Sequence, residues 1–281
     1  MNTQQQATIS GATRLIGIVG DPINQVKSPQ TWNPRLAEGG HDAVLVPIHV
    51  RAADFDGTID AIMRIANLDG LIFTMPYKER IIPHLASISR RADQVGAVNA
   101  AKRSETGAWI GDMFDGVGLL GAVRSLGIEL PGLRVGLIGA GGAGSAISFA
   151  LAESGIASLR ILDADRNRAE RLARRVAEAG VQVAPSSGPF APGNVDLLIN
   201  ATPVGMAPDD GTPIDVGALT PETSVVDIVT KPTTPLLAAA AAAGCRHAGG
   251  AAMVAAQTEA ILAFLGFADR RPWSAAAYSF L

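Results

Sequence analysis

The sequence has a single cysteine, no excess of charge of either sign and no long apolar run, and each absence removes a class of protein. One cysteine, Cys245, excludes an internal disulfide framework and fits a reducing compartment such as the cytoplasm. Its apolar, alanine-rich neighbours favour a buried structural thiol over a nucleophile. With 23 basic and 26 acidic residues, the chain lacks an electrostatic footprint for nucleic acid or an anionic membrane. We therefore expect neither as a partner.

Segments that resemble a signal or a membrane span are too polar or too short. Residues 1–12 are polar and rich in glutamine, so we expect a frayed tail instead of a signal peptide. The alanine-rich run 236–243 cannot cross a bilayer, and the preceding Thr234-Pro235 is typical of a helix start. No metal is expected, because no metal-site spacing occurs among the four histidines, His41, His49, His84 and His247.

The most informative feature present lies near the middle of the chain, at Arg134-Val-Gly-Leu-Ile-Gly139-Ala-Gly141-Gly142-Ala143-Gly144. An apolar strand runs into glycines spaced G-x-G-x-x-G. The first glycine permits a tight turn, the second lets a pyrophosphate approach the backbone, and the third lets the next helix pack close to the strand. The pattern predicts a dinucleotide whose phosphates lie on that helix's N-terminus.

A second signal concerns the cofactor. Asp163 ends a predicted strand about two dozen residues after Gly139, where a carboxylate hydrogen-bonds the ribose hydroxyls of NAD. The same carboxylate would repel the 2′-phosphate of NADP, so the sequence favours NAD over NADP. Arg166 and Arg168 can reach such a phosphate, but their position at a helix start favours solvent or local ion pairs. The alternative for Asp163 is a helix N-cap or a surface acid.

Apolar runs alternate with helix-periodic segments, which predicts an α/β fold. In the first part, a mixed or parallel sheet is expected from strands at 15–19, 43–46 and 68–73, with helices at 28–38 and 52–66. A helix from Gly116 to Leu126 carries the chain onward. The second part predicts a Rossmann-like sheet of five or six strands, at 134–138, 158–163, about 181–184, 195–199 and 224–229. The final helix, 251–264, has no strand partner there and is expected to return to the first domain.

Several short motifs together resemble the shikimate/quinate dehydrogenases. They occur in the family's order and spacing from Leu15 to Leu265. The motifs are Gly20-Asp-Pro-Ile-Asn-Gln-Val-Lys-Ser28-Pro29, Thr74-Met-Pro-Tyr-Lys78-Glu79, Gly96-Ala-Val-Asn99, Gly111-Asp112 with Asp115-Gly116-Val-Gly118, Asn200-Ala-Thr202-Pro-Val-Gly205-Met206, Asp227 with Thr234-Pro235-Leu236, and Gly250-Ala-Ala-Met253 with Gln257.

The resemblance implies reversible oxidation of a ring hydroxyl of shikimate or quinate to a ketone, with hydride passed to a nicotinamide. It implies a cytoplasmic NAD(P)-dependent alcohol dehydrogenase that binds a small cyclic hydroxy acid, as a monomer or homodimer. Residues 1–114 and 250–281 would form the substrate-binding catalytic domain, and residues 115–249 the dinucleotide-binding domain.

The resemblance also assigns roles to residues. Lys78 matches the family's catalytic lysine and Asp115 its partner aspartate, and a tuned pair is what removal of a hydroxyl proton needs. By residue type alone, the pair would be a surface ion pair. The substrate positions are Val26, Ser28, Thr74, Asn99, Thr230 and Gln257. The cofactor positions are Gly139, Gly141, Gly142, Ala143, Gly144, Asp163, Thr202, Val204 and Gly250. Without the resemblance, Asn99, Gln257 and Thr74 would be a turn amide, a helix-surface amide and a strand-end hydroxyl.

Departures from the family's pattern point to altered specificity. The usual Ser-x-Ser-Pro, whose hydroxyls hold the substrate carboxylate, reads Val26 and Ser28 here. The usual tyrosine is Thr230, the usual Asn-Thr before the aspartate is Met113-Phe114, and the histidine expected near Trp32-Asn33 is missing. One lost hydroxyl contact to a carboxylate costs about 1.5–3 kcal/mol.

A related cyclic or amino-substituted hydroxy acid, with its carboxylate displaced or replaced, therefore becomes a candidate substrate. Two alternatives stay open. One is an aminoshikimate-type dehydrogenase, which performs the same chemistry in another pathway. The other is a non-catalytic module that binds a dinucleotide or metabolite, against which the retention of Lys78 and Asp115 argues.

Overall fold

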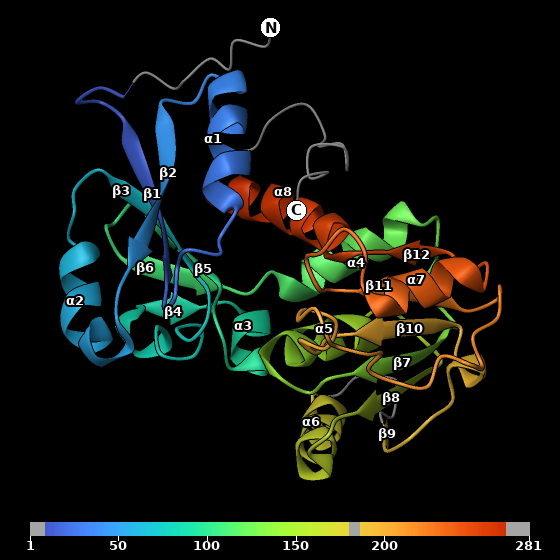
Figure 1. The fold of residues 1–281 in the computed structure, drawn as a ribbon. Helices are drawn as coiled ribbons and strands as arrows, with labels where there is room; N and C mark the ends of the chain where they lie inside the picture. Colours follow the sequence, from blue (N-terminus) through green and yellow to red (C-terminus); the bar gives the residue numbers. More distant parts are fainter. Residues whose placement is uncertain (1–8, 180–185, 268–281) are drawn as a thin grey trace, which may run out of the picture. The chain divides into compact units, whose positions relative to one another are not determined.

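The computed structural model describes residues 9–179 and 186–267, which form two compact units (Figure 1). The first unit contains residues 9–114 and 259–267, and the second contains residues 115–179 and 186–258. The chain thus passes between units after Phe114 and again after Thr258, inside its last helix. The domains predicted from the sequence were 1–114 with 250–281, and 115–249.

The first unit is built on a six-stranded mixed sheet with the order β2-β1-β3-β5-β6-β4. The strands are β1 (Arg14–Gly20), β2 (Ala43–His49), β3 (Leu68–Phe73), β4 (Ser87–Ile88), β5 (Ala100–Arg103) and β6 (Trp109–Asp112). β1 pairs parallel with β2 and β3, and β4 pairs parallel with β6, whereas β5 runs antiparallel to both β3 and β6. Residues 16–20 of β1 are all buried, as expected for a central strand covered on both faces.

The helices of this unit follow the predicted periodicity with one difference. They are α1 (Ser28–Glu38), α2 (Phe55–Ile62) and α3 (Arg90–Val95), with short 3-10 turns η1 (Ala52–Asp54) and η2 (Ile82–His84). The predicted helix 52–66 begins instead as η1 and ends at Ile62. Beyond Met63, the backbone N–H groups of Arg64 and Ile65 bond to carbonyls only three residues back, so the helix gives way to turns.

The second unit contains a six-stranded parallel sheet with the order β12-β11-β10-β7-β8-β9, the strand order of the dinucleotide-binding fold (Figure 1). The strands are β7 (Arg134–Ile138), β8 (Ser158–Leu162), β9 (Ser186–Ser187), β10 (Leu197–Asn200), β11 (Ser224–Asp227) and β12 (His247–Ala248). The predicted Rossmann-like sheet is confirmed. The strand predicted at about 181–184 lies outside the described residues.

The helices of the second unit are α4 (Asp115–Ser125), α5 (Gly142–Ala152), α6 (Arg166–Glu178), α7 (Pro235–Ala242) and α8 (Gly250–Phe264), with the 3-10 turn η3 (Pro192–Asn194). The alanine-rich run is helical in α7, with Thr234 accepting a hydrogen bond from Leu237 N as its N-cap. Cys245 is buried and its thiol donates to Thr220 O at 3.2 Å, and burial raises the pKa of this thiol.

Helix α8 contributes residues to both units, and a glycine in α4 lets its first half pack closely there. Its first half packs on α4, where a Cβ at Gly121 would lie 2.2 Å from Ala256 Cβ. Its last residues belong to the first unit, where the ring of Phe264 lies 5.4 Å from that of Phe114. The predicted return of the final helix to the first domain is therefore confirmed for these residues.

Across residues 9–179 and 186–267, no helix is both long and apolar enough to cross a membrane. The same part of the chain contains no group of His, Cys, Asp and Glu side chains arranged to hold a metal ion.

Candidate functional site

In the first unit, the segments that follow β1 and β3 meet at the carboxyl ends of these strands. Thr74 N–H donates to Val19 O at 3.0 Å, and Asp21 N–H donates to Met75 O at 3.1 Å. A Cβ at Gly20 would lie 2.5 Å from Thr74 Cγ2, so only glycine permits this approach. Thr74, predicted at the substrate, is thereby fixed at the edge where parallel sheets bind ligands.

Lys78 and Asn99 are brought together at the same edge. Val98 N–H donates to Lys78 O at 2.7 Å, and Phe73 N–H donates to Asn99 O at 2.9 Å. The Asn99 side chain is 3% exposed, and its Oδ1 accepts a hydrogen bond from Phe114 N at 2.9 Å. This bond orients the carboxamide and also positions the residue that precedes Asp115.

Val26 and Ser28 lie half-buried after β1, where Ser28 begins α1. Lys27 is the N-cap of α1 and makes no side-chain capping bond. The side chain at 26 offers no hydrogen-bonding group, so the departure seen in the sequence is a chemical change at the start of this helix. The nearby Asn33, where the family's histidine was expected, joins α1 to β2 by accepting from Leu45 N at 2.7 Å and donating to Leu45 O at 3.0 Å.

In the second unit, Asp115 is the first residue of α4 and is 3% exposed. Gln257 Nε2 of α8 donates to Asp115 Oδ1 at 2.6 Å. A Cβ at Gly118 would lie 2.9 Å from Gln257 Cβ, so this glycine lets α4 and α8 approach closely enough for the bond. A residue predicted to contact substrate is thus also the hydrogen-bond donor to the predicted catalytic carboxylate.

The glycine turn after β7 has the geometry that a pyrophosphate requires. Gly139 has φ +104° and passes so close to Ala201 that a Cβ would lie 2.8 Å from its carbonyl. A Cβ at Gly144 would lie 2.0 Å from Gly139 O, whereas Cβ atoms at Gly141 and Gly142 would meet nothing within 4 Å. α5 begins at Gly142 without a side-chain cap, so the N–H groups of its first turn, including Ala143, are available to phosphate oxygens.

Asp163 lies immediately after β8, next to this turn. Its Oδ2 accepts from Ala140 N at 2.7 Å and its Oδ1 accepts from Asp165 N at 2.8 Å. The N-cap of α6 is Asp165, whose Oδ1 accepts from Asn167 N at 3.0 Å, so the N-cap alternative does not hold for Asp163. Each Asp163 oxygen can accept one more hydrogen bond.

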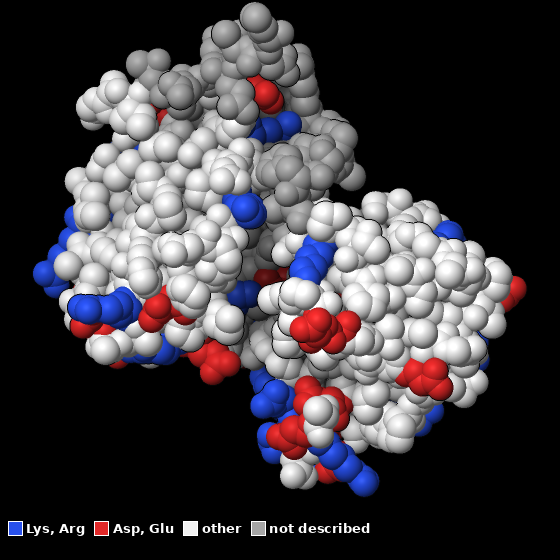
Figure 2. All heavy atoms as spheres, in the orientation of Figure 1, with Lys and Arg blue, Asp and Glu red and all other residues white. Residues whose placement is uncertain are grey.

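The two basic residues near this carboxylate lie as predicted, one in a local ion pair and the other exposed to solvent. Arg166 Nε pairs with Glu170 Oε1 at 2.9 Å on α6, where basic and acidic side chains intermix (Figure 2). Arg168 is exposed and has no ion-pair partner among the residues that the structure describes. Its side chain is therefore the one of these two that is free of an ion pair within the described ranges and could turn toward a phosphate near Asp163.

A buried polar network at the ends of β10 and β11 holds the loop that contains Thr202 and Val204, which were predicted to bind the cofactor. Asn200 Oδ1 accepts from Thr202 N at 3.0 Å and from Thr202 Oγ1 at 2.7 Å, while its Nδ2 donates to Val204 O at 3.1 Å and to Asp227 Oδ1 at 2.9 Å. Asn200 and Asp227 belong to motifs seen in the sequence, but no role was predicted for either. The available signal was that each is the polar last residue of an apolar strand.

Asp227 is fully buried and accepts two further hydrogen bonds. Thr234 Oγ1 donates to Oδ2 at 2.6 Å and Val229 N to Oδ1 at 3.1 Å. Burial raises the pKa of Asp227, and these bonds partly oppose the effect. A Cβ at Gly250 would lie 2.4 Å from Ile228 O, so this glycine lets α8 begin against the loop after β11. Thr230 lies exposed in that loop.

Comparison with known proteins agrees with this geometry. The family model described as shikimate dehydrogenase substrate binding domain matches residues 18–101. A shikimate dehydrogenase (NADP(+)) of Rubrobacter xylanophilus is 35% identical over 272 residues, which cover 95% of this chain and 92% of the relative.

Two solved structures cover nearly all of both chains. A shikimate 5-dehydrogenase of Listeria monocytogenes in complex with shikimate and NAD has a TM-score of 0.86 at 27% identity, covering 97% of each chain. The ligand-free 5-ketofructose reductase of a Gluconobacter species has a TM-score of 0.86 at 28% identity, covering 95% of this chain and 97% of that one. The sequence motifs, the strand-end geometry and these likenesses agree: the chain belongs to the shikimate dehydrogenase family, whose members are oxidoreductases acting on a hydroxyl group.

Proposed function

We propose that the chain catalyses the reversible, nicotinamide-dinucleotide-dependent oxidation of a ring hydroxyl of a shikimate- or quinate-like cyclic hydroxy acid to the ketone. The observation that carries the proposal is the buried carboxylate of Asp115, held by Gln257 at 2.6 Å. A buried carboxylate that is held by a dedicated donor suits proton transfer better than a surface ion pair.

The residues divide the reaction as follows. Lys78 and Asp115 hold the substrate hydroxyl and take its proton as the hydride leaves the same carbon. Thr74 and Asn99 bind the ring hydroxyls, and Ser28 contacts the acid group. The turn at Gly139 to Gly144 and the start of α5 hold the pyrophosphate. When bound there, a nicotinamide dinucleotide supplies the hydride acceptor for oxidation and the hydride donor for reduction.

We further propose that NAD is preferred to NADP. Two backbone N–H donors orient Asp163, and its remaining acceptor directions suit the ribose hydroxyls. A second carboxylate, Asp165, lies two residues further on, and both would repel a 2′-phosphate. The exposed Arg168 opposes this preference and limits its size.

A second substrate class is favoured by Val26. An apolar side chain where the family has a carboxylate-binding serine suits a substrate that carries no acid group at that position. The likeness to 5-ketofructose reductase supports a ketone or alcohol of a neutral polyol as this class.

A spectrophotometric screen at the nicotinamide absorbance tests the proposal. Shikimate, quinate, an amino-substituted analogue and neutral cyclic polyols are each assayed with NAD and NADP. Lys78→Ala should lower kcat on the best substrate by about 10²–10⁴ while dinucleotide affinity stays unchanged. Arg64→Ala, which removes an exposed cation elsewhere in the first unit, is the matched control. Dinucleotide binding without turnover of any compound would favour the non-catalytic module instead.

A further inference from the structure

One face of the second unit's sheet has an unusual cover at β7 and β8. On this face α7 packs through Leu236 and Ala240 against Leu198 and Val225, which belong to β10 and β11. The connection from β9 to β10 crosses the face as an extended segment with the short turn η3, where the fold commonly places a helix. A Cβ at Gly136 of β7 would lie 2.4 Å from Phe190 Cε2, so the ring of this segment rests on the strand backbone.

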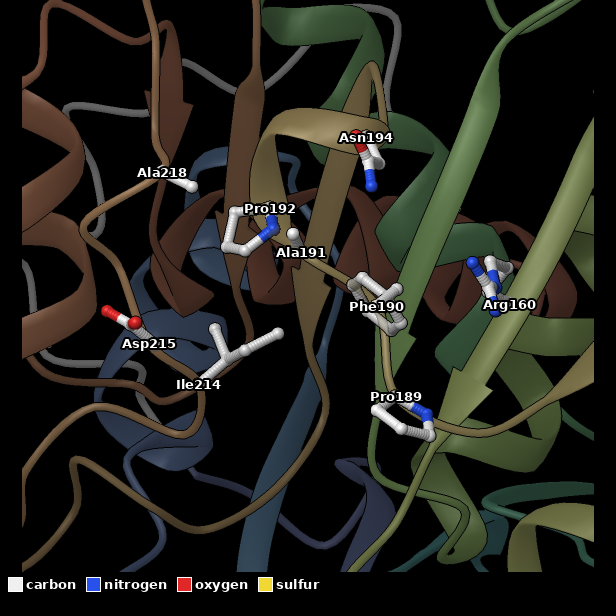
Figure 3. Close-up of a pocket in the computed structure, with 9 residues that line it drawn as sticks. All are labelled: Arg160, Pro189, Phe190, Ala191, Pro192, Asn194, Ile214, Asp215 and Ala218. Atoms are coloured by element: carbon white, nitrogen blue, oxygen red, sulfur yellow. The ribbon is translucent and has the colours of Figure 1, made fainter.

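This thin cover leaves a hollow of about 450 Å³ (Figure 3). Phe190, Pro192 and Ile214 form its apolar part, and Asn194 contributes an amide at the rim. The Arg160 guanidinium lies on one side and the Asp215 carboxylate on the other, with the apolar residues between them (Figure 3). The volume is in the range of small-molecule sites.

Arg160 is the feature that points to a ligand. It occupies the middle of β8, between Leu159 and Ile161, which are fully buried on the opposite face. Its side chain is exposed and makes no hydrogen bond or ion pair within the described part of the chain. A guanidinium beside an apolar surface can bind a carboxylate bidentately.

Asp215 indicates which charge a ligand would carry at the other side of the hollow. Its Oδ1 accepts from Gly217 N at 2.9 Å, and it has no cationic partner within the described residues. A second anionic group at this end would be repelled, whereas an ammonium group would be attracted. The two sides of the hollow thus have opposite charges separated by an apolar surface.

The hollow lies away from the edge where the dinucleotide is expected. Arg160 precedes Leu162, the last residue of β8, and Asn194 and Ala218 precede the first residues of β10 and β11. The segments that carry Asn194 and Ala218 therefore lead into the amino ends of strands, while the glycine turn and Asp163 follow carboxyl ends. An occupant of the hollow and a bound dinucleotide do not share these residues.

We propose that this hollow binds a small aromatic zwitterion with its carboxylate on Arg160, its ring against Phe190 and Ile214, and its ammonium group toward Asp215. Isothermal titration of the full chain with 4-(aminomethyl)benzoate tests this directly. Benzoate and benzylamine, which each carry one of the two charges, should bind more weakly. Arg160→Gln and Asp215→Asn should each weaken binding about three- to tenfold. Arg64→Gln, an exposed arginine of the first unit, should not change it.

Three outcomes would overturn the proposal: no saturable binding up to the solubility limit, equal affinity in Arg160→Gln, or displacement of the probe by NAD. Because Arg160 and Asp215 are exposed, unchanged circular dichroism and thermal midpoints are expected for both variants. The titration uses no substrate turnover, so its result does not depend on the proposed activity.

Discussion

Replacing Asp227 by asparagine would remove the negative charge of the buried network while nearly keeping the shape of the side chain. The substituted side chain keeps an oxygen for the hydrogen bonds from Asn200 Nδ2 and Val229 N. It places an NH2 group where Oδ2 of Asp227 accepts from Thr234 Oγ1. Thr234 can accept from this group but loses its own acceptor; where Asp227 is ionised, exchanging the bond to a carboxylate for a neutral one costs about 1 kcal/mol, which opposes the gain from removing a buried charge. The loop from Thr202 should keep its place.

Because Asp227 can ionise, the difference in unfolding free energy between wild type and this variant depends on pH. Burial raises the pKa of Asp227, so the folded state binds its proton more tightly than the unfolded state does. The wild type therefore loses stability as pH rises from the unfolded pKa, about 3.9, through the folded pKa, and the loss is complete above it. The carboxamide of the Asp227→Asn variant does not titrate. Below pH ~4, where Asp227 is a neutral acid, the variant should match wild type within about 1 kcal/mol, and it should gain stability relative to wild type as pH rises toward 7.

Urea unfolding at a series of pH values, followed by circular dichroism and fitted with separate transitions for the two units, measures this difference. Asp209→Asn, which removes an exposed carboxylate of the same unit, is the control and should give a flat difference. Dinucleotide affinity should be unchanged in the Asp227 variant. A difference that stays constant with pH, or that favours wild type more at higher pH, would refute the raised pKa.

Other substitutions test the cofactor preference, the role of Val26 and the packing of Phe190. Wild type should use NAD better than NADP by about tenfold or more in kcat/KM, and Asp163→Ser should narrow that gap; better use of NADP by wild type would contradict the role of Asp163. Val26→Ser should lower KM for shikimate or quinate by up to about tenfold with a smaller change in kcat; unchanged KM for both acids would place the carboxylate elsewhere. Gly136→Ala should destabilise the fold by about 1–3 kcal/mol, and Phe190→Leu should restore most of this loss; additive losses in a thermal melt of the double variant would exclude the ring as the cause.

Much of the fold followed from local pattern. The predicted bounds of α1, β3 and β7 agree with the structure, because amphipathic periodicity and buried apolar runs act within a few residues. The glycine turn was also readable, since a positive φ and close backbone contacts leave glycine as the residue that fits. The short strands β4, β5 and β6 were not predicted, because two to four residues carry too little periodicity.

The long-range pairs are what the sequence by itself did not determine. Gln257 bonds to Asp115 across 142 residues of chain, Asn200 bonds to Asp227 across 27, and Phe190 rests on Gly136. Each contact depends on strand order or on a close approach at a glycine, and the local sequence does not tell which residues will meet. Local chemistry therefore predicted which residues belong to a site, while tertiary packing decided which carboxylate each donor holds.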